Sequence, residues 1–261
     1  MKFIKGFMDY RFLLNELVKK GIRLKYRRSY LGILWSLLEP ILTTIVLVIV
    51  FGELFNRGPE FPVYIIVGRL TYSFFQSGTK GALTAIRKNA GMIKKVYVPK
   101  YLYPLSSVLF NFIIFAISLI VIVFTFIYSI LNGAEIAITW NILWWIPCLA
   151  ILLVLTIGVG LILCTLNVFF RDIEYLWNVG LMLIMYMSAI FYPAEKFIDS
   201  SFGFLLKFNP LFQIIDVSRS AWMGYDINYL GILYAAVVAF VSLVVGLIVF
   251  RKNQDKFILH I

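Results

Sequence analysis

The feature that most constrains this chain is a series of long apolar runs that takes up most of its 261 residues. A helix needs about 20 apolar residues to cross the hydrocarbon core of a bilayer. With 62% hydrophobic and only 14% charged residues, the chain also lies far from the composition of soluble domains. We therefore expect an all-α polytopic membrane protein with six transmembrane helices. The runs are 31–55, 61–86, 101–131, 140–170, 174–193 and 229–250.

The distribution of positive charge predicts the orientation of these helices. Basic residues collect in the short connections on the cytoplasmic side of a membrane. Eighteen of the 24 Lys and Arg residues lie in 1–30, 87–100, Arg171 and the tail after residue 250, and four lie in connections on the opposite side. Both termini are therefore expected to be cytoplasmic. The formal net charge of +11 then belongs to a membrane face, and no nucleic-acid partner is expected.

Two segments outside the spans have patterns of their own. Residues 1–30 form a basic segment in which 9–26 have the periodicity of an amphipathic helix that lies in the membrane interface. The six-span domain then covers 31–261. Near its end, 194–222 are apolar in patches and interrupted by Asn209-Pro210. We expect two short helices there in the outer leaflet, with Asn209-Pro210 as the turn between them.

Residues for enzymatic chemistry are scarce. His260 is the single histidine, and there is neither a cluster at metal-ligand spacing nor a GxxxxGK[ST] loop for ATP phosphates. Cys148 and Cys164 lie in one apolar run and are interpreted as packing residues. We expect no cofactor in this chain and no enzymatic activity, so any ATP-driven work requires another subunit.

The alternative is a multispan enzyme that acts on lipid-linked sugars. It would need paired carboxylates at a membrane face. The acids expected outside are scattered, which makes this alternative the weaker one. They are Glu195, Asp199, Asp216 and Asp226.

A polar stripe marks the second expected span. The stripe consists of Arg69, Tyr72, Ser73, Gln76 and Lys80, whose spacing places them on one helix face. Charged groups inside spans usually face a bundle interior or an aqueous path. For Arg69 and Lys80 two interpretations stay open, a place in a translocation path or a side chain that reaches back to the headgroups.

The first expected span has a polar face as well. Trp35, Ser36, Glu39 and Thr43 share that face. A carboxylate within a span needs a partner. We consider an ion pair between Glu39 and Lys80, within one chain or across a dimer, and a protonated Glu39 bonded to a neighbouring helix.

The connection 87–100 is basic and also carries an apolar set. A solvated loop would need no such set, so we expect a short amphipathic helix that docks onto a cytoplasmic partner. A loop on the membrane surface is the alternative. A second contact is expected at Phe170, Arg171 and Asp172, where Asp172 is also placed to cap the fifth span. The contact residues of the first segment are Arg87, Lys88, Asn89, Met92, Ile93, Lys94, Lys95, Val96 and Tyr97.

Several strings, taken with their order and spacing, resemble one known family. Over nearly its whole length the chain is similar to the membrane subunits of ABC exporters for cell-surface polysaccharides, such as O-antigen and teichoic acid exporters (type 2 ABC permeases). Arg69 departs from this likeness, because the family usually has an apolar residue there. The matching strings are Lys25 to Trp35 with Glu39-Pro40, Tyr72 to Phe75, Asn89 to Pro104, Phe169 to Asp172, and Asn209-Pro210.

The resemblance implies a homodimer in the lipid of the bacterial cytoplasmic membrane, bound to two copies of an ATPase subunit that holds ATP and Mg. The complex would export a polyprenyl-linked glycan. The segment 87–100 would be the coupling helix, and the helix over 9–26 a further ATPase contact. The first and fifth spans would line the conduit.

Aromatic side chains of this conduit would present flat faces to passing sugar rings. Ordinary helix packing is the alternative for each of them. They are Trp35, Tyr175, Trp177, Tyr186, Phe191 and Tyr192.

Overall fold

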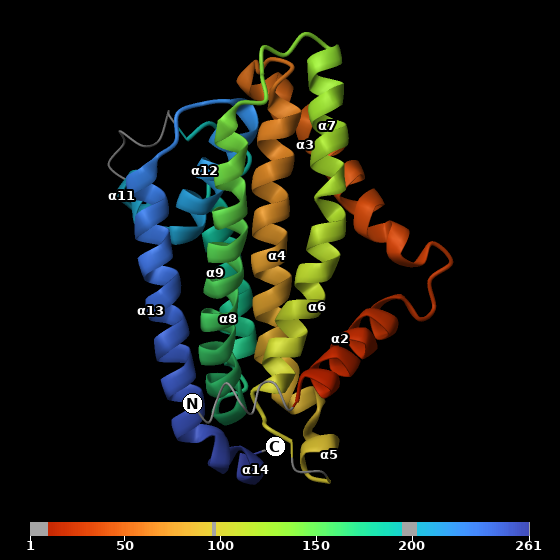
Figure 1. Cartoon of the computed structure of the whole chain (residues 1–261), viewed down its shortest axis with the longest axis vertical. Coiled ribbons are helices and arrows are strands. Elements are labelled where there is room, and N and C mark those ends of the chain that lie inside the picture. Colours follow the sequence, from red (N-terminus) through yellow and green to blue (C-terminus); the bar gives the residue numbers. More distant parts are fainter. Residues whose placement is uncertain (1–9, 96–97, 195–202, 261) are drawn as a thin grey trace.

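The computed structural model describes residues 10–95, 98–194 and 203–260, and this part of the chain is helical throughout, without a strand (Figure 1). The longer helices are α2 (Arg11–Tyr26), α3 (Trp35–Phe55), α4 (Phe61–Lys88), α6 (Leu102–Ser118), α7 (Ile120–Leu131), α8 (Trp145–Phe169), α9 (Ile173–Tyr186), α12 (Pro210–Met223) and α13 (Tyr229–Asn253). The short ones are η1 (Gly32–Leu34), α5 (Ala90–Ile93), η2 (Trp140–Trp144), α11 (Gly203–Lys207), η3 (Gln254–Lys256) and α14 (Phe257–His260).

Four helical stretches of the described chain are long and apolar enough to cross a membrane. They are Gly32–Phe55, Leu102–Leu131, Trp140–Phe169 and Tyr229–His260, and each coincides with a predicted run. Helix α4 has 28 residues, but its polar stripe lowers its hydropathy, and α9 is apolar but has only 14 residues. The helical, multi-pass fold is confirmed, whereas the number of six crossings stays a prediction.

The predicted run 174–193 is wrong in its last seven residues, 187–193. Helix α9 ends at Tyr186, and Ala189 has a φ of 47°, a left-handed conformation that a non-glycine residue adopts only when its surroundings impose it. Side chains of distant elements take up the carbonyls of this turn, so hydrogen bonds end the helix where hydropathy alone would continue it. The bonded carbonyls are those of Met187, Ala189, Ile190 and Tyr192.

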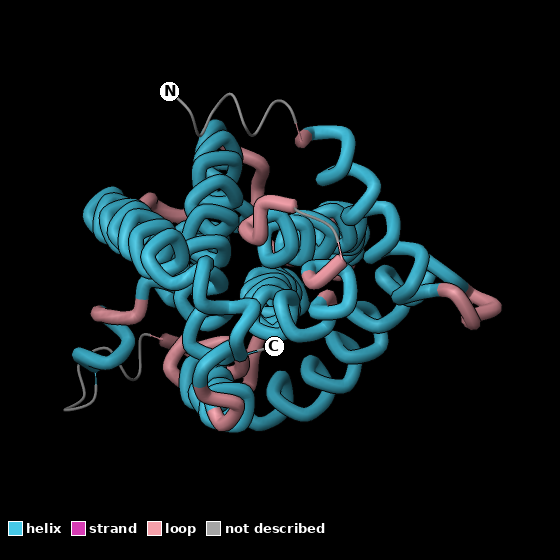
Figure 2. Tube along the Cα trace, turned by 90° about the horizontal axis from the view of Figure 1, so that it is seen from below, coloured by secondary structure: helices cyan, strands magenta, loops and turns pink. Residues whose placement is uncertain are grey.

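Helix α4 is the centre of the bundle. It packs against α3, α6, α7, α8, α9 and α12, and most of its residues are buried. Figure 2 shows the bundle from one end, with the helices gathered around its long axis. Helices α8 and α13 approach closely at Gly158 and Gly246, where a Cβ on either glycine would meet backbone atoms of the other helix. A central helix surrounded in this way contacts neighbours on several faces.

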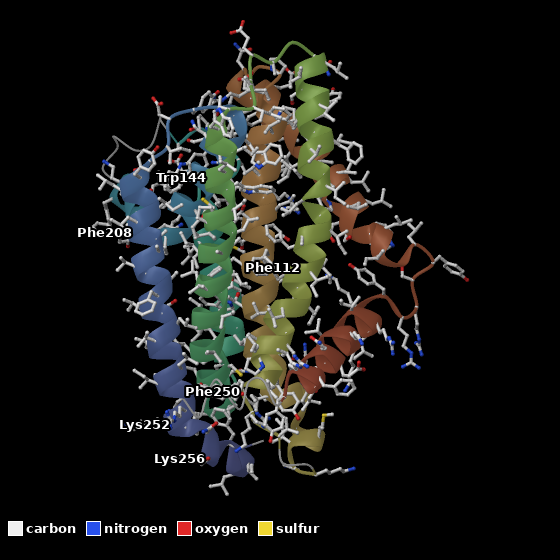
Figure 3. The ribbon with its side chains drawn as sticks, in the orientation of Figure 1. Phe112, Trp144, Phe208, Phe250, Lys252 and Lys256 are labelled. Carbon is white, nitrogen blue, oxygen red and sulfur yellow. The ribbon has the colours of Figure 1, made fainter. Side chains whose placement is uncertain are left out.

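The two ends of the bundle differ in character. Helices α5 and α14 and the α8–α9 connection lie at one end, which we name the α5 end, and α11 and α12 lie toward the other, the α12 end (Figure 1). Lys252 and Lys256 are labelled at the α5 end in Figure 3. Exposed basic side chains gather there, which agrees with the charge pattern of the sequence. They are Lys88, Lys94, Lys95, Arg171, Arg251, Lys252 and Lys256.

The α5 end has a small apolar core of its own. Leu14 and Leu17 of α2 pack with Ile93 of α5 and with Phe250 and Phe257 of the C-terminal helices. Helix α2 covers most of the predicted helix over 9–26, and its apolar side packs on α6. Its place in the membrane interface stays a prediction. This core joins the two chain ends to the segment around α5.

The described part of the predicted segment 194–222 contains the helices α11 and α12, and their place in the outer leaflet stays a prediction. Helices α11 and α12 meet at Asn209-Pro210, as predicted. The Asn209 side chain caps α12 by accepting a hydrogen bond from the Leu211 amide at 3.0 Å, and Pro210 occupies the first helical position. Residues 195–202, with Glu195 and Asp199, lie outside the described residues.

Candidate functional site

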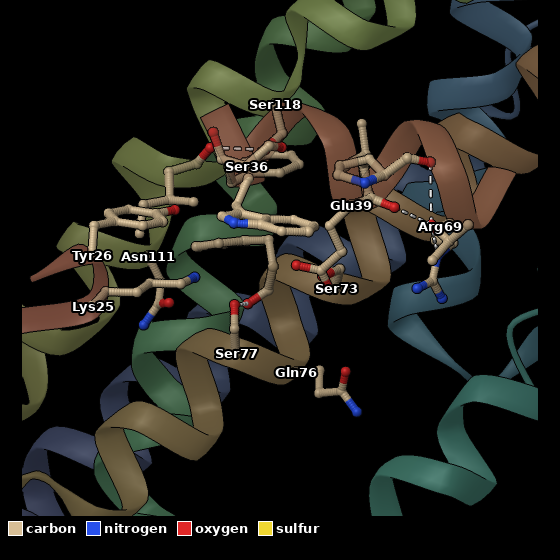
Figure 4. A pocket seen from close by; sticks show the side chains of 17 residues that line it. Lys25, Tyr26, Ser36, Glu39, Arg69, Ser73, Gln76, Ser77, Asn111 and Ser118 are labelled. Carbon is tan, nitrogen blue, oxygen red and sulfur yellow. Dashed lines mark hydrogen bonds between the residues drawn. The ribbon is translucent and has the colours of Figure 1, made fainter. Parts of the chain in front are cut away.

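A polar pocket of about 250 Å³ lies where α2, α3, α4 and α6 meet (Figure 4). Trp35 and Glu39 from α3 line it together with Arg69, Ser73 and Gln76 from α4. These residues all belong to the two polar faces that the sequence predicts. The structure therefore brings the two faces together at one place.

Arg69 is held in this pocket by α3. Its Nε donates a hydrogen bond to Thr43 Oγ1 at 3.1 Å, and Thr43 Oγ1 in turn donates to the Glu39 carbonyl at 2.7 Å. The Glu39 carboxylate interacts electrostatically with both Arg69 and Lys25. Two cations thus share one acid, which leaves the pocket wall with an excess of positive charge.

The predicted ion pair between Glu39 and Lys80 is wrong within one chain. Lys80 lines a different pocket, between α4 and α9, beside Glu174. Arg69 and Lys80 are eleven residues apart, about 16 Å along a helix, so only one of them is level with Glu39. Helix α3 is inclined to α4 (Figure 1), and Glu39 and Arg69 line the same pocket (Figure 4). A pair across a dimer stays a prediction.

The residues of the polar stripe on α4 do not all contact the same neighbouring helix. Tyr72 is buried and turned toward α9, where its hydroxyl donates a hydrogen bond to the Leu181 carbonyl at 2.8 Å. Arg69 and Gln76 face the pocket beside α3, and Lys80 faces α9. The translocation-path residues predicted on α4 therefore divide between two neighbours of the central helix.

The predicted coupling segment consists of the end of α4, the short α5 and a turn. Asn89 ends α4, and its side chain donates to the Ala85 carbonyl at 2.8 Å. Lys94, Lys95 and Met92 are exposed, as a docking surface requires. Ile93 is only 6% exposed and packs in this chain's own core, so its prediction as a partner contact is wrong. Val96 and Tyr97 lie outside the described residues.

Arg87 bonds within this chain, and its side chain is 34% exposed. Its Nη1 donates to Glu174 Oε2 at 3.4 Å and to Asn167 Oδ1 at 3.5 Å. Asn167 is fully buried, and its Nδ2 donates to the Leu83 carbonyl at 3.0 Å. This cluster joins the ends of α4 and α8 to the start of α9. Sequence reasoning missed Asn167, although an amide inside an apolar run was a usable signal.

The connection between α8 and α9 is exposed to solvent in this chain. Phe170, Arg171 and Asp172 are exposed, so all three are accessible for the second predicted contact. Asp172 occupies the N-cap position of α9, as predicted, but its side chain makes no capping hydrogen bond.

The predicted aromatic residues do not form one surface. Tyr175 and Tyr186 are exposed on α9. Trp177 is turned to α4, where its Nε1 donates to Thr79 Oγ1 at 3.1 Å. Phe191 stacks on Phe51 of α3 with 5.5 Å between ring centroids. The Tyr192 hydroxyl donates to the Tyr186 carbonyl. Packing accounts for the last three.

A buried arginine holds the turn after α9. Arg219 of α12 is 3% exposed, with its guanidinium 3.5 Å from the ring centroid of Tyr64. Its Nε donates to the Tyr64 carbonyl at 3.0 Å and its Nη2 to the Ile190 carbonyl at 3.2 Å. Burial lowers the pKa of Arg219, and the neighbouring Tyr64 and Asp216 oppose that shift. Sequence reasoning counted Arg219 only as a loop charge.

Cys148 and Cys164 are both buried in α8 and unpaired, which agrees with their interpretation as packing residues. Among the described residues, no group of three His, Cys, Asp or Glu side chains is arranged to hold a metal ion.

Comparison with known proteins extends over almost the whole chain. The chain is 31% identical to the O-antigen export system permease protein RfbA of Klebsiella pneumoniae, over 94% of this chain and 93% of that protein. It is 27% identical to RfbA of Myxococcus xanthus, over 98% of both chains. It is 26% identical to the polysialic acid transport protein KpsM of Escherichia coli, over 96% of both. Residues 13–223 match the family described as ABC-2 type transporter, and the chain therefore belongs to the ABC-2 type transporter family.

Proposed function

We propose that this chain is the transmembrane subunit of an ATP-driven ABC exporter for a cell-surface polysaccharide. The cargo is a polyprenyl-linked glycan, such as an O-antigen, a teichoic acid or a related polymer, which crosses the bacterial cytoplasmic membrane. The observation that carries the proposal is the end-to-end similarity to export permeases for O-antigen and polysialic acid. The exposed basic turn after α5, at the end of the central helix, supports it.

The proposed assembly has two copies of this chain and two copies of an ATPase subunit. Each copy crosses the membrane six times, with α4 and the segment that begins with α9 as the crossings beyond the four apolar ones. The α5 end is cytoplasmic, because basic residues stay on that side. ATP and Mg bind the partner ATPase. The segment around α5, together with α2, contacts that partner.

The conduit is proposed to lie along α3 and α9. Both helices present apolar faces that no described residue covers, and Tyr175 and Tyr186 stand on the face of α9. Trp35 and Glu39 of α3 and Arg69 of α4 line the polar pocket. An excess of positive charge there suits an anionic polymer. The exposed apolar residues of the two faces are Leu42, Ile45, Val46, Ile49, Val50 and Leu54 on α3, and Leu176, Val179, Met182 and Leu183 on α9.

The alternative, an enzyme for lipid-linked sugars, finds little support. Of the four acids considered for it, Asp216 and Asp226 are described, and Asp216 lies in α12 near Arg219. The names of the relatives are those of transport proteins.

The proposal is tested by co-expressing the tagged chain with the ATPase encoded beside its gene. Purification in mild detergent is expected to give a complex of two plus two that hydrolyses ATP. An ATPase whose nucleotide-binding lysine is replaced serves as the control, because it should assemble without turnover. A stable chain that retains no ATPase would overturn the proposal and favour the enzyme.

Reversing the charge of Lys94 and Lys95 to glutamate is expected to uncouple the complex. Opposed like charges at a docking surface cost several kcal/mol, which corresponds to a loss of ATP-driven export of about tenfold or more. Met92→Asp should act in the same direction, because Met92 is the exposed apolar residue of α5. The measurement is export per ATP hydrolysed in proteoliposomes.

The matched control for this reversal is Arg251→Glu with Lys252→Glu. These two residues are exposed at the same end but belong to α13. Equal loss in both double variants would mean that total charge matters and that α5 is not a specific contact.

A further inference from the structure

Helix α9 buries little of its surface within this chain, as does α3, whose buried residues are Ser36 and Thr44. Leu181 is its one buried residue, whereas α4 and α8 each bury many. It packs mainly against α4 and α8. Apolar burial contributes most of the stability of a typical helix packing, and α9 has little of it within this chain. Specific bonds therefore have unusual weight in fixing its position.

Three side-chain hydrogen bonds join α9 to α4 at different positions along the helices. Tyr72 donates from its hydroxyl to the Leu181 carbonyl at 2.8 Å. Thr79 accepts from Trp177 Nε1 at 3.1 Å. Arg87 donates to Glu174 Oε2 at 3.4 Å. The spacing of seven and eight residues places the three bonds about two turns apart, on nearly one face of α4. We name Tyr72, Thr79 and Arg87 the α4 tethers.

The tethers lie on the helix that leads into α5. Helix α4 ends at Lys88 and α5 begins at Ala90, so Asn89 alone separates them. Asn89 is bonded back to α4 through both its backbone amide and its side chain. A displacement of α5 therefore displaces the end of α4 by nearly the same amount. Because α4 is central and largely buried, it can move only as one rigid body.

We propose that the α4 tethers are positioning residues that carry the displacement of α5 to α9. This inference rests on the proposed function, in which an ATPase moves α5 and α9 borders the conduit. Without the tethers α9 keeps its contacts but no longer follows α4. Losing one hydrogen bond in a site of low dielectric shifts such an equilibrium by about fivefold, and the three bonds act together.

The test follows the exposure of α9 in the intact complex with its ATPase. Met182→Cys places a thiol on the exposed side of α9, and the native Cys148 and Cys164 are buried. The rate at which a water-soluble maleimide labels the introduced thiol is measured in nanodiscs with and without ATP and Mg. The chain that carries only Met182→Cys is the parent, to which the other substitutions are added. We expect ATP to change the labelling rate of this parent by about fivefold or more.

Two substitutions remove tethers with little change of shape. Tyr72→Phe removes the hydroxyl and Thr79→Val removes the acceptor for Trp177. The matched controls are Tyr128→Phe, at an exposed tyrosine of α7, and Thr84→Val, at a threonine that bonds only to carbonyls of its own helix. The tether variants should lose most of the ATP-dependent change in labelling while the partner still hydrolyses ATP, and the controls should retain it.

The outcomes separate the inference from the function on which it rests. If the parent binds no ATPase, the proposed function fails. If the parent binds ATPase but the tether variants respond to ATP as it does, the inference fails and the function stands. Arg87→Glu should abolish the response, and adding Glu174→Arg should restore at least part of it. Absence of rescue would assign Arg87 to ATPase contact and remove it from the tethers.

Discussion

Replacing Gly158 by alanine is expected to force α8 away from α13 and to destabilise the protein severely. A Cβ atom at Gly158 would lie 2.5 Å from the backbone nitrogen of Leu243 and 2.5 Å from Ser242 Oγ. Gly246 is placed reciprocally, with its Cβ position 2.6 Å from the Gly158 carbonyl oxygen. A backbone atom cannot turn aside as a side chain does, so the helices themselves must separate. Small residues at such crossings allow the close approach that holds membrane helices together.

The expected cost is about 1 to 3 kcal/mol or more, the range for inserting a methyl group into a packed interior. The measurement is the thermal unfolding midpoint in detergent, followed by size-exclusion chromatography of heated samples. Gly180→Ala is the matched control, because its Cβ would meet only the Trp177 ring at an ordinary 3.6 Å. If Gly158→Ala is as stable as Gly180→Ala, the contact between α8 and α13 is looser than described.

The long helices were predictable because one physical requirement fixes their length. A span must be apolar for about 20 residues, and the runs 31–55, 101–131, 140–170 and 229–250 each correspond to one helical stretch. The start of α12 was equally local, since Asn209 caps it and Pro210 begins it. These features depend on residues next to one another in the sequence.

The turn after α9 was not predictable, because distant residues cause it. Ala189 lies in an apolar run that continues to Tyr192, yet Tyr64 and Arg219 bond to the carbonyls around it. Those partners are more than 25 residues away in the chain. Hydropathy measures the preference of each side chain for an apolar or an aqueous environment. It contains no information about hydrogen bonds to distant residues.

The candidate site was predictable in its residues and not in its geometry. The polar stripe from Arg69 to Lys80 was recognised, but helical spacing alone predicted that all its residues face the same neighbour. Helix α4 has neighbours on several faces, so Tyr72 meets α9 while Arg69 meets α3. Asn167 and Arg219 were missed because the bonds that make them important connect them to residues far away in the sequence. Their importance depends on burial, which the fold decides.

Arg219→Met is expected to release the turn between α9 and α12. The substitution removes the donor to the Ile190 carbonyl and the second donor to the Tyr64 carbonyl, which lies within α4. A buried group left without a partner costs about 1 to 3 kcal/mol. Removing a buried cation recovers part of its desolvation cost. The loss should exceed that gain, because the guanidinium also covers the Tyr64 ring at 3.5 Å. We expect a net destabilisation of about 2 kcal/mol or more.

Two further variants decide whether bonding or charge matters at this position. Gly68→Ala keeps the arginine but places a Cβ 2.5 Å from Arg219 Nη2, and moving that nitrogen breaks its bond to Ile190. Arg57→Met removes a neighbouring cation that lies 5.9 Å from the Tyr64 ring centroid. The thermal midpoint should fall for Arg219→Met and Gly68→Ala and stay nearly unchanged for Arg57→Met. A fall for both arginine variants with none for Gly68→Ala would mean that positive charge at the α12 end, and not the bonds of Arg219, holds the turn.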